Sequence, residues 1–316
     1  MAHLKICAAA PGKIILTGEH FVVWGATALA AAIDKRVTAA AEHAGEDEIV
    51  SENYGTRSKI AKGIGKGLYP IARAIYATKE HISSKKQVRV TIRSDIRPSS
   101  GLGSSSAVAV ATVASVAKAL GADLSKKEIF DLAMESERII HGNPSGIDVA
   151  VSIYGGIILY RKGEPPKEVK VEECDAVVGL SGLSRRTAKM VSRVAEVRET
   201  SPNFFNALVA SSSHLSMFAS KSIEKRDYYD LASVMTFHNS ALSWLGLSIP
   251  TTDEMIEICL ENGALAAKIT GGGGGGAIIS IPKQGKAQEI EKALQSKGFE
   301  SFSVKLPQQG LKVWEE

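Results

Sequence analysis

Serine and glycine residues that could bind phosphate gather in one short segment, residues 99–106, which reads Ser-Ser-Gly-Leu-Gly-Ser-Ser-Ser. Alternating apolar and polar residues at 88–93 predict a strand before it, and the Ala- and Val-rich residues 107–120 predict a buried helix after it, closed by Gly121. This order favours phosphate binding, because glycines let the backbone approach a ligand, and unpaired N–H groups and the helix dipole attract negative charge. The alternative is an ordinary turn with a helix N-cap, where Gly and Ser are also common.

The segment does not match the most familiar nucleotide-binding motifs. No Gly-Lys-Ser/Thr follows it, which excludes a Walker A loop, and Ser106 stands where G-x-G-x-x-G requires a third glycine. The sequence contains neither His-Arg-Asp nor Asp-Phe-Gly, which excludes the protein-kinase set.

Two carboxylates could do chemistry beside such a loop. Ser125 and Glu128 form a capping box that predicts a helix, and Glu137 falls on the partly apolar face of that helix. A carboxylate there needs a partner, which could be a structural salt bridge or a cation. Asp148 follows an irregular Gly- and Pro-containing loop, where it could either cap a helix or act as a buried functional carboxylate.

Charged side chains also lie beside the glycine turns of the N-terminal region: Lys13, Glu19 and His20. Short apolar runs between these turns predict strands. These strands are expected at residues 6–10, 14–16 and 21–24. For the three charged residues, solvated turn positions are the alternative to a functional role.

Six consecutive glycines, residues 271–276, lie between two strand-like segments. Such a run is costly in conformational entropy. It could be a flexible hinge, but the apolar residues close on both sides favour a close approach of its backbone to a ligand or another loop.

The remaining pattern predicts a mixture of helices and strands without an internal repeat. Residues 46–57 are polar and predict a loop, and residues 163–167 are the best candidate for a domain boundary. Further helices are predicted at residues 68–78, 185–198, 204–222, 228–244, 252–261 and 288–294, and further strands at 37–41, 157–160, 176–180 and 301–304.

Length and composition indicate a globular protein of two domains: 316 residues, 44% hydrophobic and 23% charged. A formal net charge of +4 is too mild to favour a nucleic-acid partner. Cys7, Cys174 and Cys259 have no metal-site or disulfide spacing, which favours a reducing compartment. Without a signal-peptide pattern or a bilayer-length apolar run, we expect a cytoplasmic protein with no membrane partner.

Three separated motifs stand in the order found in the GHMP small-molecule kinases, and the match spans nearly the whole chain. They are residues 11–13 with 18–20, then 98–107, then 268–276. The chain is therefore identified as resembling this family. Within the family, residues 137–148 (Glu-Arg-Ile-Ile-His-Gly-Asn-Pro-Ser-Gly-Ile-Asp) resemble the signature of the mevalonate kinases.

The resemblance implies an α+β fold of two domains. Residues 1–165 would form a ribosomal-protein-S5-like α/β domain with the phosphate loop and the catalytic base, and residues 166–316 a ferredoxin-like α+β domain with the glycine-rich loop. The implied activity is ATP-dependent phosphorylation of the terminal hydroxyl of (R)-mevalonate, on the route to isoprenoids, with Mg²⁺ as cofactor. A homodimer is also expected.

The resemblance further implies roles for individual residues. Asp148 would be the general base with Lys13 close to it, and Ser105 and Glu137 would ligate magnesium. Contacts to the ATP phosphates are expected from Ser94, Ser99, Ser100, Gly101, Leu102, Gly103, Ser104 and Ser105. Contacts to mevalonate are expected from His20, Glu19, Thr187 and Ser145.

Two other functions compete with this one. A sister kinase of the same family could phosphorylate phosphomevalonate, homoserine or a sugar, although residues 141–148 argue against it. A non-catalytic relative could bind ATP or a sugar and regulate a partner. Such a sensor should have lost the base or a metal ligand, whereas this sequence keeps Asp148, Glu137 and Lys13.

Overall fold

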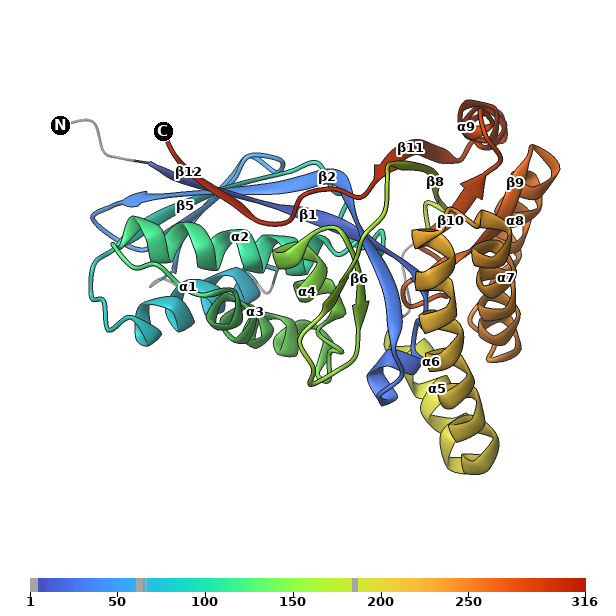
Figure 1. The fold of residues 1–316 in the computed structure, drawn as a ribbon. Coiled ribbons are helices and arrows are strands. Elements are labelled where there is room, and N and C mark those ends of the chain that lie inside the picture. Colours follow the sequence, from blue (N-terminus) through green and yellow to red (C-terminus); the bar gives the residue numbers. More distant parts are fainter. Residues whose placement is uncertain (1–4, 61–64, 66, 184–186) are drawn as a thin grey trace.

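Two β-sheets, each packed against helices, form the framework of the chain (Figure 1). The computed structural model describes residues 5–316 except 61–64, 66 and 184–186, and it leaves the side chains of residues 187–189 undescribed. The first sheet and its helices occupy the left of Figure 1, and the second sheet with its helices occupies the right.

The first sheet has eight strands in the order β12-β1-β2-β5-β3-β4, with β6 paired to β2 and β7 paired to β6. The strands are β1 (Ile6–Thr17), β2 (Ala28–His43), β3 (Glu48–Ser51), β4 (Thr56–Lys59), β5 (Val88–Ser94), β6 (Ile157–Tyr160), β7 (Lys167–Val169) and β12 (Lys312–Glu315). The register of β1 against β2 shifts between Pro11 and Lys13. Such a bulge changes the direction in which the following side chains point, so it helps to aim Lys13.

Four helices cover one face of this sheet (Figure 1). They are α1 (Tyr69–His81), α2 (Ser104–Ala119), α3 (Lys126–His141) and α4 (Ile147–Tyr154). Helix α2 consists mainly of Ala, Val and Ser, and these small side chains let it pack closely against β1 and β2. The predicted capping box of α3 is confirmed: Ser125 Oγ accepts from the Glu128 N–H, and the Glu128 carboxylate accepts from the Ser125 N–H at 2.8 Å.

The second sheet has four antiparallel strands in the order β11-β8-β10-β9. They are β8 (Cys174–Leu180), β9 (Ala264–Thr270), β10 (Ala277–Pro282) and β11 (Glu300–Leu306). The helices of this half are α5 (Thr187–Thr200), α6 (Pro202–Glu224), α7 (Tyr228–Trp244), α8 (Pro250–Glu261) and α9 (Ala287–Ser296). Helices α7 and α8 pack on β9, while α9 packs on β8 and β11.

Elements with a strong periodic pattern are confirmed. The predicted strand at 88–93 is β5, the strand at 157–160 is β6, and the helix at 228–244 is α7. The helix predicted at residues 185–198 corresponds to α5, whose described part begins at Thr187. Its predicted start, residues 185 and 186, lies outside the described residues.

Three predictions from the N-terminal half are wrong. The strands expected at residues 6–10 and 14–16 are one continuous strand, β1, in which Pro11 to Lys13 forms a bulge instead of a turn. Residues Phe21–Trp24 form a 3-10 helix (η1) instead of a strand, since a short apolar run does not distinguish the two and Gly25 at φ 89° closes the turn. Residues 46–57 include the hairpin of β3 and β4 instead of a loop. Cross-strand charge pairing explains this polar hairpin: the Glu48 carboxylate binds Arg57, and it accepts from Arg89 Nε at 2.7 Å.

The chain crosses between the two halves more than once. Strand β7 pairs with β6, and β12 pairs with β1, so both belong to the first sheet although they lie beyond residue 165. The predicted domain boundary between residues 165 and 166 stays a prediction, and the pairing shows that the first sheet also takes strands from the C-terminal part. Strand β12 carried no clear pattern in the sequence because all of its residues are exposed.

Close contacts fix the segment that leads back to β12. The guanidinium of Arg36 donates to the carbonyl oxygens of Ala9 at 3.2 Å and Gly310 at 3.1 Å. Gly155 has φ 67°, and a Cβ there would lie 2.0 Å from the Gly310 nitrogen, so only glycine fits. The segment around Gly310 is therefore closely packed against the first half of the molecule.

Candidate active site

Lys13 and Asp148 form an ion pair at the centre of the candidate site, with Lys13 Nζ 3.1 Å from Asp148 Oδ1. Lys13 comes from the bulged part of β1, and Asp148 from the first turn of α4. Lys13 is 2% exposed and Asp148 30% exposed, so the aspartate is the side of the pair that a ligand can reach. The structure thus brings together the two residues that the resemblance placed at the reaction.

The serine-rich loop before α2, residues 99–103, lies directly against this ion pair. The Lys13 N–H donates to the Leu102 carbonyl at 2.8 Å. Gly103 has φ 76°, and a Cβ there would lie 3.0 Å from Lys13 Cγ and 3.8 Å from Asp148 Oδ2. A glycine is needed here because the loop backbone must approach the pair this closely.

Helix α2 begins at Ser104, three residues earlier than the sequence predicted. Ser104, Ser105 and Ser106 therefore lie in its first turn, where backbone N–H groups have no partner within the helix. The N-terminus of α2 points this set of donors and its positive dipole end at the loop that precedes it. The arrangement predicted for phosphate binding is present.

Two of the predicted phosphate-binding serines have other uses in this structure. Ser94 Oγ donates to the Ile96 carbonyl at 2.9 Å and accepts from the Ile96 N–H. Ser100 Oγ donates to the Arg97 carbonyl at 2.7 Å. These hydroxyls therefore hold the shape of the turns before α2, and the predicted contacts of Ser94 and Ser100 to phosphate stay a prediction.

Glu137 is 3% exposed and lies on α3 near the serine-rich turn, as its place on the apolar face predicted. Burial raises its pKa, the like charge of Asp148 adds to the rise, and His141 and the Ser105 hydroxyl oppose it. His141 Nε2 lies 3.7 Å from Glu137 Oε2, whereas Glu137 Oε1 is buried without a hydrogen-bond partner among the described residues. A buried carboxylate oxygen without a hydrogen-bond partner is unusual in a folded protein, and a bound cation would satisfy it.

A cleft of about 260 Å³ opens beside the ion pair. His20, Ser145, Glu137 and both members of the ion pair line it. Apolar side chains also line it: Ile15, Val22, Val23, Trp24, Ile147, Val149, Val191 and Ala195. The cleft therefore suits a small ligand that has an apolar side and a polar group able to reach Asp148.

Sequence reasoning missed two polar residues of this cleft, His141 and Asn143. Both lie in the block that resembled the family signature, which was the available signal. Ser145 borders the cleft, and its carbonyl accepts from the Tyr160 hydroxyl at 2.8 Å; its predicted contact with mevalonate stays a prediction. Thr187 begins α5, but its side chain lies outside what the structure describes.

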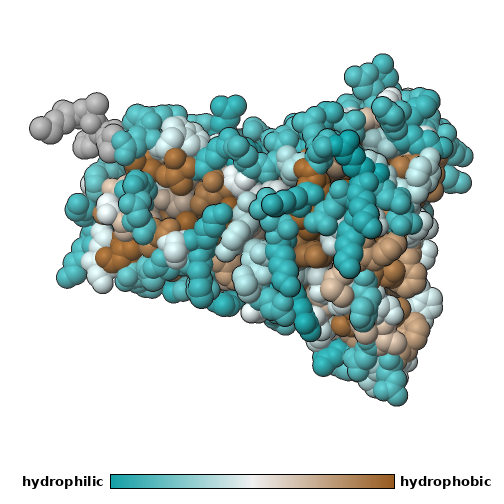
Figure 2. Space-filling model, in the orientation of Figure 1, coloured by the Kyte–Doolittle hydropathy of each residue, from teal (hydrophilic) through white to brown (hydrophobic). Residues whose placement is uncertain are grey.

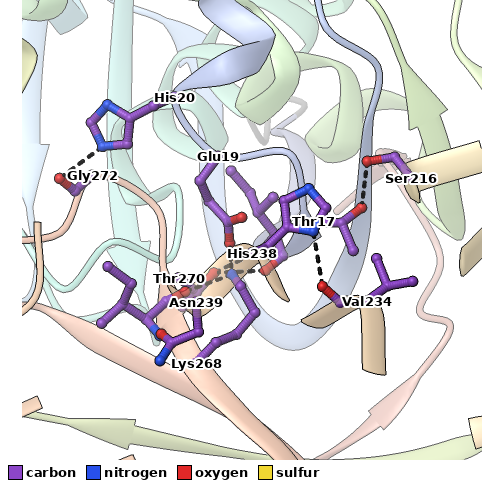
Figure 3. Close-up of polar contacts among 12 residues, drawn as sticks. Thr17, Glu19, His20, Ser216, Val234, His238, Asn239, Lys268, Thr270 and Gly272 are labelled. Carbon is purple, nitrogen blue, oxygen red and sulfur yellow. Dashed lines mark hydrogen bonds and ion pairs between the residues drawn. The ribbon is translucent and has the colours of Figure 1, made fainter. Parts of the chain in front are cut away.

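Glu19 and His20 diverge although they are neighbours in the chain (Figure 3). His20, at φ 60°, borders the cleft, and its Nε2 lies 3.0 Å from the Gly272 carbonyl oxygen. Glu19 is fully buried and forms an ion pair with Lys268, which is buried as well. This geometry favours a positioning role for Glu19 over the direct substrate contact that was predicted.

The glycine run joins β9 to β10 and packs closely against its surroundings. A Cβ on Gly273 would lie 2.5 Å from the Leu247 carbonyl oxygen, and the Gly274 N–H donates to that oxygen at 2.8 Å. Gly276 borders a hollow of about 170 Å³ whose other side is formed by residues 97–100. The run is therefore a close-packed loop beside the serine-rich turn, which agrees with the close-approach alternative and not with a free hinge.

Metal-binding clusters and membrane-spanning helices are both absent from the described ranges. There, no group of three or more His, Cys, Asp or Glu side chains could hold a metal ion. Across residues 5–316, apart from the gaps given above, no helix is long and apolar enough to cross a membrane.

Comparison with known proteins shows the family of this chain. Residues 70–156 match the GHMP kinases N terminal domain and residues 219–300 the GHMP kinases C terminal domain. The chain is 31% identical to a mevalonate kinase of Aeropyrum pernix, with 98% of each chain covered. Its fold resembles the crystal structure of the Methanococcus jannaschii mevalonate kinase, with a TM-score of 0.83, 25% identity, and coverage of 97% of this chain and 99% of that one. It also resembles the L. major mevalonate kinase in complex with R-mevalonate, with a TM-score of 0.79, 25% identity and 96% of each chain covered.

These matches confirm the predicted α+β fold with N- and C-terminal GHMP kinase domains. With relatives above 30% identity aligned over almost their full length, the chain belongs to the mevalonate kinases of the GHMP kinase family.

Proposed function

We propose that this protein transfers the γ-phosphoryl group of ATP to the terminal hydroxyl of (R)-mevalonate, giving 5-phosphomevalonate and ADP. The observation that carries the proposal is the 3.1 Å pair of Lys13 and Asp148, which contacts the glycine-containing loop at Gly103 and lines a cleft with many apolar side chains. These apolar side chains suit the methyl and methylene groups of mevalonate.

Asp148 is the proposed general base. As the hydroxyl oxygen of mevalonate forms its bond to the γ-phosphorus, the bond from phosphorus to the leaving oxygen of ADP breaks and the hydroxyl proton passes to the Asp148 carboxylate. Lys13, with its Nζ 3.1 Å from Asp148 Oδ1, orients the aspartate carboxylate beside the reacting hydroxyl. Its positive charge also offsets negative charge that develops on the transferring group.

The serine-rich loop and the N-terminus of α2 are the proposed binding site for the ATP phosphates. Residues 99–105 supply backbone N–H groups, and the helix dipole favours the negative charge. The hollow between residues 97–100 and Gly276 supports a nucleotide that lies where the two halves meet. Phosphoryl transfer depends chiefly on such positioning and charge neutralisation.

The residues beside the loop fit a magnesium ion, which we propose as the cofactor. Glu137 has a buried carboxylate oxygen without a hydrogen-bond partner among the described residues, and the Ser105 hydroxyl lies beside this carboxylate. Hard oxygen ligands of this kind suit Mg²⁺, which takes its remaining ligands from phosphates and water. When bound, the ion would supply positive charge to the phosphate oxygens.

Glu137→Gln should raise the Mg²⁺ concentration needed for half-maximal activity by at least roughly tenfold. Loss of an outer-shell partner alone typically costs about 10- to 100-fold in metal affinity, and Glu137 is proposed as a direct ligand. The measurement is initial rate against Mg²⁺ concentration at fixed ATP. Glu135→Gln is the matched control, since Glu135 lies on the same helix but pairs with Arg73 at 2.6 Å. An unchanged Mg²⁺ dependence in Glu137→Gln would remove Glu137 from the metal site.

The test of the function itself is an acceptor panel. The purified protein with Mg²⁺–ATP should form ADP rapidly with (R)-mevalonate and at most slowly with phosphomevalonate, homoserine or galactose. A phosphorylated acceptor, identified by mass, separates transfer from ATP hydrolysis. Turnover restricted to another acceptor would favour a sister kinase, and binding of ATP without turnover of any acceptor would favour the sensor alternative.

We also propose that the protein acts in the cytoplasm and as a homodimer. Aromatic side chains that are exposed in the single chain support the dimer: Phe204 on α6 and Trp244 on α7 lie 4.8 Å apart between ring centroids and are 46% and 59% exposed. Figure 2 shows hydrophobic residues gathered at the lower right of the molecule, where Figure 1 places α5 and α6.

A further inference from the structure

The ion pair of Glu19 and Lys268 joins the two halves of the molecule in its interior. Both side chains have no exposed surface. Glu19 lies between β1 and η1, whereas Lys268 lies in β9, three residues before the glycine run. The Lys268 ammonium also donates to the Ile269 carbonyl at 2.6 Å, so it is fixed from two directions (Figure 3).

Further polar contacts cross the same junction. Thr270 Oγ1 accepts from the Ile15 N–H at 2.9 Å and donates to the Ile15 carbonyl at 3.2 Å, which fastens the end of β9 to β1. His20 Nε2 lies 3.0 Å from the Gly272 carbonyl oxygen, which fastens the turn after β1 to the glycine run. Glu19 lies between Ile15 and His20 in the first segment, and Lys268 precedes Thr270 and Gly272 in the second. The three contacts together hold residues 15–20 against residues 268–272.

Burying the Glu19–Lys268 pair has an electrostatic cost, so stability alone does not explain the pair. Burial raises the pKa of Glu19 and lowers the pKa of Lys268, which is the cost of removing both charges from water. The second carboxylate oxygen of Glu19 is buried without a hydrogen-bond partner among the described residues. Buried ion pairs of this kind are often no more stabilising than apolar side chains of the same shape, whereas their directional contacts can specify one geometry.

The two fastened segments both border the candidate active site. His20, Gly271 and Gly272 line the cleft that contains the Lys13–Asp148 pair. A sliding of the glycine run against the turn after β1 would move these walls relative to the reacting groups. A misplacement of about 1 Å can cost about 10²-fold in rate, so the register between the segments matters for the reaction.

We propose that Lys268 is a positioning residue for phosphoryl transfer: its ion pair with Glu19 fixes the register between the Glu19–His20 turn and the glycine run, and thereby places His20 at the substrate cleft. Lys268 itself is fully buried and touches no ligand space. Its kinetic role rests on the proposed function, while its role in holding the glycine run does not.

The test compares the single variant Lys268→Met with the neutral pair Glu19→Gln/Lys268→Met. The single variant leaves a carboxylate buried without its cation and should be strongly destabilised. The neutral pair removes both charges at similar volume, so its thermal stability should recover towards wild type. Its kcat should nevertheless stay about 10- to 100-fold low with a raised KM for mevalonate, because the register is no longer specified.

Hydrogen exchange provides a readout that does not depend on activity. In the folded neutral pair, amides of residues 271–276 and 17–25 should exchange faster than in wild type, while the strands of the first sheet should be unchanged. Equal exchange in these segments would overturn the proposal whichever acceptor the enzyme uses. Recovery of wild-type kcat together with stability would also overturn it, because the ion pair would then be structural only.

Two further variants separate positioning from direct action. His20→Ala should lower kcat/KM in wild type. In the neutral pair the same substitution should add little further loss, because His20 is already misplaced there. If the kcat/KM losses of His20→Ala and of the neutral pair multiply, the proposal is contradicted.

Asp47→Asn/Lys79→Met is the matched control, since that pair lies 2.6 Å apart, is 10% exposed on each side chain and is remote from the cleft. It should keep kcat.

Discussion

Asp148→Asn should lower kcat for mevalonate phosphorylation by roughly 10²- to 10⁴-fold, the range that a general base contributes. The amide keeps the size of the carboxylate and can still contact Lys13, so the fold and the cleft should persist. It cannot take up the hydroxyl proton, because that proton transfer requires the carboxylate. The KM values for both substrates should change little, since the carboxylate acts on the reacting hydroxyl.

ADP release, followed continuously at saturating substrates, measures this loss, and thermal melting checks the fold. Asp131→Asn on α3 is a suitable control, because Asp131 is exposed and pairs with Lys127. Equal rates for Asp148→Asn and wild type would remove Asp148 from the mechanism. A large rise in KM with unchanged kcat would instead make Asp148 a substrate-binding residue.

Lys13→Met should lower kcat by roughly 10²- to 10³-fold, the loss typical of a missing electrostatic partner in the transition state. Methionine matches the length of the lysine stem, which is enclosed by Gly103 and the β1 bulge. Lys13→Arg should recover only part of the rate. The space beside the Lys13 side chain is narrow, since even a Cβ on Gly103 would lie 3.0 Å from Lys13 Cγ, and a planar guanidinium is bulkier than an ammonium group. Initial rates over a range of ATP and mevalonate concentrations give kcat and both KM values.

The double variant Lys13→Met/Asp148→Asn shows whether the two residues act together. Since they form one ion pair at 3.1 Å, losing both should cost much less than the product of the single losses. If the losses multiply, Lys13 and Asp148 act independently and the proposed shared mechanism is wrong. Lys127→Met, at a side chain 81% exposed, controls for the loss of a positive charge.

Local sequence patterns predicted the local structure well where the pattern was long. The capping box at Ser125 and Glu128 predicted α3, and Glu137 on its apolar face is buried as expected. The start of α2 was placed too late because Ser104 to Ser106 resemble a loop by composition, although serines are equally suited to the first turn of a helix. Strand β12 was missed because its exposed residues show no alternation.

Long-range placement could not be derived from local patterns. Nothing in the residues around Lys13 or Asp148 indicates that they meet, and their convergence was expected only from the resemblance to a family. The partner of Glu19 was missed for the same reason: Lys268 lies in a distant strand of the other sheet. Direct substrate contact for Glu19 was expected only from the family resemblance, and the packing of the two halves encloses its side chain.

Strand β12 and the segment fastened by Arg36 have a consequence for how the molecule unfolds. Because the first sheet borrows its outer strand from the far end of the chain, the N-terminal half is not a self-sufficient folding unit. Released alone, it would present the open edge of β1 as a template for aggregation. The two GHMP kinase domains therefore do not correspond to two independently stable folding units. We expect them to unfold together in a single cooperative thermal transition.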